Sequence, residues 1–127
     1  MSRKVTVLTL NLENKVVNTT KPTIVCLCGS TRFFKEFQLA DLAETIAGKI
    51  VLSISCDRTY EDEVLSTKSV EEREAIYKIL DVVHKQKIDL ASEILVINVG
   101  GYIGASTQLE IQYAKDNSKA IRYLEAI

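Results

Sequence analysis

Ile24-Val25-Cys26-Leu27-Cys28 is an unbroken run of apolar residues. Such a run is typical of a parallel strand that is buried on both faces of a sheet. A second run, Ile94 to Val99, is apolar except for Asn98 and leads into a glycine-rich loop. Because segments with helical periodicity separate these runs, the sequence predicts an α/β fold in which helices cover both faces of the sheet.

Strands and helices are expected to alternate along the rest of the chain. Ser69 and Glu72 have the spacing of a capping box, which marks the start of the second helix. The expected strands are 24–28, 50–54, 93–99 and 120–124, the expected helices are 31–47, 69–91 and 107–117, and a loop is expected at 57–68. With right-handed crossovers, this order predicts a three-layer, Rossmann-like or flavodoxin-like parallel sheet of strand order 2-1-3-4. Ligands bind to such sheets where the order reverses, beyond the carboxyl ends of the first and third strands.

The length of 127 residues fits a single domain, 1–127. Pro22 is the only proline and follows a polar stretch, so it separates an N-terminal segment from the main body. Residues 4–9 and 10–17 alternate between apolar and polar side chains, which predicts that residues 1–21 form a hairpin extension or an added edge strand. Residues 22–127 are expected to form the α/β core.

The charge of the chain is nearly balanced, with a formal net value of −1. No general attraction to nucleic acid or to an anionic membrane is therefore expected. The apolar runs are too short to cross a bilayer, so we expect a cytoplasmic protein. Its three cysteines are expected to be reduced. No metal site is expected either, because Cys26 and Cys28 have no matching Cys/His pair and His84 is the only histidine.

The loop Gly29-Ser30-Thr31-Arg32 joins the first expected strand to a helix. The unpaired N–H groups and the dipole of a helix N-terminus favour an anion, and the Arg32 guanidinium can grip a phosphate through two parallel hydrogen bonds. The simpler interpretation is that Ser30 or Thr31 only caps the helix while Arg32 points into solvent. The local sequence leaves both interpretations open.

A second loop follows the third expected strand. It contains Gly100, Gly101 and Gly104, which allow close approach of the backbone, and Ser106 and Thr107, which place hydroxyl groups at the start of a helix. Tyr102 could bond to a carboxylate or flank a base, although a loop tyrosine is as often simple packing.

Glu110 lies one turn inside the helix that follows the second loop. Thr107 and Glu110 have capping-box spacing, so the glutamate could serve only as a cap. Its place opposite the Gly29 loop favours a chemical role instead. A carboxylate there can attack an electrophilic carbon without a metal or cofactor, as in glycosyl-enzyme chemistry. His84 could exchange a proton near neutral pH, although a histidine on a helix surface is the commoner case.

These segments resemble the nucleoside 2-deoxyribosyltransferase superfamily, in particular its small branch of 2'-deoxynucleoside 5'-phosphate N-hydrolases. Cys28-Gly29-Ser30-Thr31-Arg32 is similar to the Cys-Gly-Ser-Ile-Arg of that branch. The family also has a glutamate followed by a helix of small residues. The segment that resembles this region is Gly104-Ala105-Ser106-Thr107-Gln108-Leu109-Glu110-Ile111-Gln112-Tyr113-Ala114. The resemblance covers about residues 23–124 and leaves the N-terminal extension unmatched.

The resemblance implies that Glu110 is the nucleophile that attacks the anomeric carbon and expels the base. It also implies that Gly29, Ser30 and Arg32 hold a 5'-phosphate, with Ser106 nearby. The chain departs from the family in three places. Cys26 falls where many members have a tyrosine, and His84 where they have an aspartate that helps the base depart. The transferases also often have an aspartate a few residues before the glutamate, where this chain has Ser106 and Thr107. A histidine could still act as the acid.

The sequence therefore predicts an N-glycosidic-bond enzyme, either a 2'-deoxyribosyltransferase or a 2'-deoxynucleoside 5'-monophosphate N-glycosidase, that needs no cofactor. Its partner would be a small nucleotide or nucleoside, and residues 22–127 would be a nucleotide-binding core. A homodimer or larger homo-oligomer is implied by the resemblance. The main alternative is a nucleotide-binding or sensing module that has lost catalysis, and a third is another Rossmann-like phosphate-binding enzyme in which Glu110 is only a cap.

Overall fold

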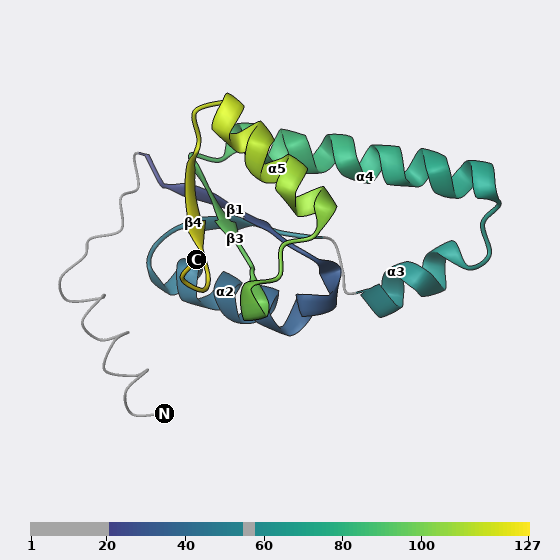
Figure 1. Cartoon of the computed structure of the whole chain (residues 1–127), viewed down its shortest axis with the longest axis horizontal. Helices are drawn as coiled ribbons and strands as arrows, with labels where there is room; N and C mark the ends of the chain where they lie inside the picture. Colours follow the sequence, from purple (N-terminus) through teal and green to yellow (C-terminus); the bar gives the residue numbers. More distant parts are fainter. Residues whose placement is uncertain (1–20, 55–57) are drawn as a thin grey trace.

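A computed structural model of the chain describes residues 21–54 and 58–127 (Figure 1). The predicted hairpin falls almost entirely within 1–20, outside the described residues. The strands are β1 (Ile24–Cys28), β2 (Ile50–Leu52), β3 (Glu93–Val96) and β4 (Ala120–Tyr123). The helices are α2 (Phe34–Ile46), α3 (Arg58–Leu65), α4 (Val70–Leu90) and α5 (Ala105–Asp116), with short 3-10 helices η1 (Thr31–Phe33) and η2 (Val99–Gly101).

The sheet has the predicted topology. Its strands are all parallel and lie in the order β2-β1-β3-β4. In the central pair Cys26 is opposite Ile94 and Cys28 is opposite Val96. The order reverses between β1 and β3, so the loops after these two strands meet at one edge of the sheet.

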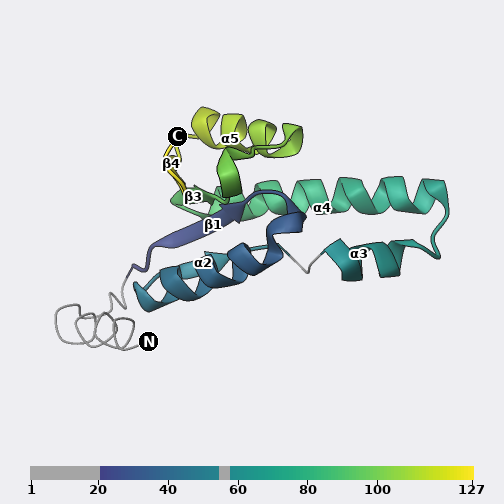
Figure 2. The ribbon, with the colours of Figure 1, turned by 60° about the horizontal axis from the view of Figure 1, so that its bottom comes forward.

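The buried residues form two apolar layers, one on each face of the sheet. Successive residues of a strand point to opposite faces, which divides each central strand between the two layers. The layer under α2 consists of Val25, Leu27, Phe37, Ala40, Leu95 and Ile97. The layer under α4 and α5 consists of Cys26, Cys28, Ile88, Ala91, Ile94, Val96, Ile111 and Ala114. Figure 2 shows α2 and α5 on opposite sides of the strands, which confirms the three-layer prediction.

The predicted loop at 57–68 is wrong for most of its length, because residues 58–65 form α3. The segment contains no glycine or proline, and Leu65 at its end is buried at 5% exposure. The charged and hydroxyl side chains that suggested a loop are compatible with a short helix whose other faces contact solvent. The ends of β2 and β3 also come earlier than predicted, at Leu52 and Val96.

The long helix α4 begins as the sequence predicts. The Ser69 hydroxyl accepts from the Glu72 N–H at 3.1 Å, and the Glu72 carboxylate accepts from the Ser69 N–H at 3.0 Å. The first half of α4 extends beyond the strands, with α3 beside it (Figures 1 and 2). In the described part of the chain, no helix is both long and apolar enough to cross a membrane.

Four charged side chains tie the elements together near the amino ends of the strands. The Lys49 ammonium lies 3.3 Å from Glu44 and 2.8 Å from Glu93, and the Arg122 guanidinium pairs with the same two carboxylates. Burial alone would raise the pKa of Glu93, but hydrogen bonds from Lys49 and Arg122 hold that pKa below its usual value. The network joins α2, β3 and β4 at the edge of the sheet opposite the glycine loops.

Candidate functional site

A pocket of about 380 Å³ opens at the carboxyl ends of β1 and β3, where the sheet order reverses. This volume is in the range of small-molecule binding sites. Five of the residues singled out in the sequence line it, namely Gly29, Thr31, His84, Ser106 and Glu110. They come from the loop after β1, from α4 and from α5, so residues far apart in the chain lie around one cavity.

Glu110 extends from the second turn of α5 into this pocket. Its side chain is 18% exposed, and its Oε2 atom lies 3.7 Å from Nε2 of His84. Burial raises the pKa of the Glu110 carboxyl above its ordinary value, while the adjacent His84 opposes the rise. A half-buried carboxylate against a histidine is a pair suited to nucleophilic and acid–base chemistry.

The capping-box interpretation of Glu110 is wrong. The helix begins at Ala105, two residues earlier than predicted, and Gly104 is its N-cap. Glu110 therefore lies past the position from which a side chain can bond back to the cap. Thr107, the predicted cap, is instead a buried residue of α5 at 4% exposure. The carboxylate is thus left to face the pocket.

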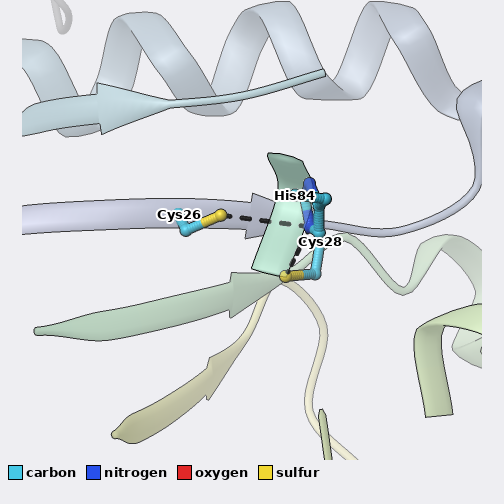
Figure 3. Close-up of side chains that lie close together, drawn as sticks. All are labelled: Cys26, Cys28 and His84. Carbon is cyan, nitrogen blue, oxygen red and sulfur yellow. Dashed lines mark hydrogen bonds between the residues drawn. The ribbon is translucent and has the colours of Figure 1, made fainter. Parts of the chain in front are cut away.

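Two cysteines of β1 contact the imidazole of His84 (Figure 3). The distance from Nε2 is 4.0 Å to Sγ of Cys26 and 3.4 Å to Sγ of Cys28. The pKa of the Cys26 thiol is lowered to about 6 despite its burial, because Cys28 donates a hydrogen bond to it and His84 lies nearby. The pKa of the Cys28 thiol is raised, because it is hydrogen-bonded to Cys26 and buried. Burial alone would lower the pKa of His84, but Cys26 and Glu110 raise it above its usual value.

The first loop combines a cap with a pocket wall. The Ser30 hydroxyl accepts from the Arg32 N–H at 3.3 Å, so Ser30 caps η1 as the simpler interpretation held. Gly29 is packed so closely that an added Cβ would lie 3.0 Å from the Ile97 carbonyl oxygen and 3.3 Å from Cζ of Phe37. A side chain at this position would push the loop away from the sheet.

Arg32 and Tyr102 contact each other across the two loops. The guanidinium lies 4.6 Å from the centroid of the Tyr102 ring, which in turn packs edge-on against Phe33. Stacking on an aromatic face keeps a guanidinium in place without neutralising it. Within the described residues, neither Arg32 nor Tyr102 belongs to the pocket lining. Their part in holding a phosphate remains a prediction.

The second glycine loop is held by the C-terminal segment. Gly100 and Gly101 have φ values of 63° and 80°, in the left-handed region that favours glycine. Both carboxylate oxygens of Glu125 accept from the Gly100 N–H at 3.1 Å. The fully buried Asn98 side chain donates to the Glu125 carbonyl at 2.9 Å and accepts from its N–H at 2.8 Å. Gly101 and Gly104 thus shape the loop around the site rather than line the pocket.

Helix α4 supplies pocket residues that the sequence analysis did not single out. They are Tyr77, Leu80, Asp81, Val83 and Lys87, and α3 and the segment after β2 add Glu61 and Ile54. The Lys87 ammonium also donates to the Ser53 carbonyl at 2.6 Å, which fixes it at the rim. Residues three, four or seven positions from His84 share its face of the helix. Most of the α4 pocket residues, at positions 77, 80, 81 and 87, have this spacing, so the position of His84 predicts them.

Comparison of the chain with protein-family models, with curated proteins and with solved structures found no match.

Proposed function

We propose that the protein is a cytoplasmic enzyme that cleaves or transfers the N-glycosidic bond of 2'-deoxynucleosides or their 5'-monophosphates, as the sequence resemblance to the nucleoside 2-deoxyribosyltransferases implies. The observation that carries the proposal is the Glu110–His84 pair at 3.7 Å in the wall of a pocket at the sheet's switch point. Neither side chain is needed there to cap a helix. His84 comes from α4 and Glu110 from α5, and the two side chains meet in the lining of this pocket.

In the proposed reaction, a carboxylate oxygen of Glu110 forms a bond to the anomeric carbon as the bond from that carbon to the base nitrogen breaks. The electron pair of the broken bond stays on the base, which takes a proton from His84. The raised pKa of His84 favours the protonated imidazole that this step needs. Water then releases the sugar in hydrolysis, or the nitrogen of a second base does so in transfer. The 2'-deoxy sugar is expected because the missing hydroxyl makes the oxocarbenium-like transition state easier to reach.

The test is release of free base from deoxynucleoside monophosphates, with the matching ribonucleotides as controls. We expect turnover of the deoxynucleotides only. If no base is released but the deoxynucleotide raises the melting temperature, the protein is a nucleotide-binding module and not an enzyme. Equal turnover of the ribonucleotides would contradict the substrate class.

A 5'-phosphate is expected to bind at the loop after β1, where Gly29 and Thr31 line the pocket beside the η1 N-terminus. We expect Arg32→Ala to weaken monophosphate binding by about 1.5 to 3 kcal/mol and to leave free nucleosides nearly unchanged. Titration calorimetry with matched nucleoside and monophosphate measures both values. Lys35→Ala removes a nearby exposed cation and should have little effect. Equal losses for nucleoside and monophosphate in Arg32→Ala would remove the phosphate role.

A homo-oligomer is proposed on the same resemblance and on the exposed apolar side chains of α4. Ile79 and Val82 are each more than half exposed, at 59% and 53%, and their spacing of three residues places them on one face of α4. Apolar side chains exposed together on a projecting helix favour contact with another chain. In sedimentation velocity the wild-type protein should form a dimer or larger species, and Val82→Asp should shift it to the monomer. Leu39→Asp, with 51% exposure on α2, is the matched control and should not.

A further inference from the structure

We propose that Cys26, Cys28 and His84 form a three-ligand site for a thiophilic divalent metal ion of the zinc type. The two sulfurs and Nε2 of His84 all lie within 4.8 Å of one another (Figure 3). Two thiolates and one imidazole are donors that zinc prefers, and three protein ligands leave a fourth position open.

The two sulfur–nitrogen distances are close to those around a tetrahedral ion. With metal–sulfur bonds of about 2.3 Å and metal–nitrogen bonds of about 2.0 Å, tetrahedral geometry separates sulfur from nitrogen by about 3.5 Å. The separations from Nε2 are 3.4 Å for Cys28 and 4.0 Å for Cys26. An ion between the three atoms therefore requires only small side-chain rotations.

The arrangement arises from the sheet itself. Cys26 and Cys28 are two residues apart on β1, so their side chains point to the same face, and α4 packs His84 onto that face. Both cysteines are fully buried, whereas the other strand residues of this layer are Ile94 and Val96. A purely apolar layer would not need two sulfurs directed at one ring nitrogen. A rigid strand and a long helix hold the three donors before any ion arrives.

The pocket gives the ion both an entry path and a fourth ligand. His84 lines the pocket, and on its pocket side Nε2 faces the Glu110 carboxylate at 3.7 Å. A bound ion would take Glu110 or a water molecule at its open position. It would also occupy Nε2 of His84, the residue that gives a proton to the base in the proposed reaction. On the proposed function, metal binding and catalysis therefore exclude each other, although the binding site itself does not depend on that function.

Direct titration of the reduced, metal-free protein with Zn²⁺ and Co²⁺ tests the site. We expect one ion per chain, a higher melting temperature with Zn²⁺, and a thiolate-to-cobalt charge-transfer band with Co²⁺. Cys28→Ser and His84→Gln should each weaken zinc by about 100-fold or more, because even loss of a residue that only orients a ligand costs 10- to 100-fold. Asp116→Asn, at the end of α5 and outside the pocket lining, is the control and should bind zinc as the wild type does.

Circular dichroism shows whether each variant folds. If a variant of a buried cysteine does not fold, His84→Gln still tests the site, because His84 is partly exposed and its replacement should be tolerated. A folded wild type with no stoichiometric binding, or cobalt binding without the thiolate band, would overturn the site. Unchanged zinc affinity in folded His84→Gln would do the same. These readouts involve no substrate, so they stand whether or not base release is observed. If the enzyme is active, zinc should inhibit it and a chelator should restore the rate.

Discussion

Replacement of Glu110 by glutamine should lower the rate of base release by about 10³-fold or more, which is about 4 kcal/mol of transition-state stabilisation. Glutamine keeps the size and polarity of the side chain but has no oxygen able to form the glycosyl-enzyme bond. The side chain is only 18% exposed, and glutamine needs no burial of charge, so the fold should be retained. Steady-state assays with a deoxynucleoside monophosphate, alongside its binding constant, separate the lost chemistry from lost binding.

The matched control for this substitution is Asp116→Asn, which removes a carboxylate from the end of the same helix, away from the pocket. It should leave the rate within about twofold, since exposed substitutions have small effects. Retained activity in Glu110→Ala is the result that would end the nucleophile assignment. Full binding with no turnover in Glu110→Gln would be its strongest support.

Phe37→Ala should destabilise the fold by about 3 to 5 kcal/mol, the cost of truncating a fully buried aromatic side chain. Phe37 is 1% exposed and is the largest side chain in the layer between α2 and the sheet. Its ring also lies beneath Gly29, where it would be 3.3 Å from an added Cβ. The cavity left by alanine should therefore loosen the loop that lines the pocket as well as the core.

Urea unfolding monitored by circular dichroism measures this loss of stability. Leu39→Ala lies on the same helix with 51% exposure and should change stability by about 0.5 kcal/mol or less. A loss below about 1 kcal/mol for Phe37→Ala would show that α2 does not depend on this contact. If the loop depends on the ring, ligand affinity should fall in Phe37→Ala and remain unchanged in Leu39→Ala.

The strands and their order follow from the sequence because burial on both faces leaves a clear mark. Residues 24–28 and 94–97 are apolar without interruption, and the structure buries nearly all of them. Right-handed crossovers then leave few possible strand orders. The ends of the elements were harder to predict. Polar residues suit both a short helix and a loop, so α3 was missed, and two hydroxyl residues competed with Gly104 as the cap of α5.

The site was predictable where it depends on topology and not where it depends on side-chain contacts. The carboxyl ends of β1 and β3 must meet, and this places Gly29, Ser106 and Glu110 together. The rotation of α4 about its axis decides that His84 reaches the cysteines of β1, and no local pattern encodes an interaction across 56 and 58 positions. The stacking of Arg32 on Tyr102 was hidden for the same reason.

The Lys49, Glu93, Glu44 and Arg122 network lies at the amino end of the sheet, while the pocket lies at the carboxyl end. This charged network is thus separated in space from the side chains proposed to meet a substrate. Substitutions that reshape the pocket should leave these ion pairs intact, so their effects on the free energy of unfolding should add to those of substitutions in the network. Substitutions in α4 and in the loops can therefore change substrate specificity while the charged network at the opposite edge of the sheet keeps the fold stable.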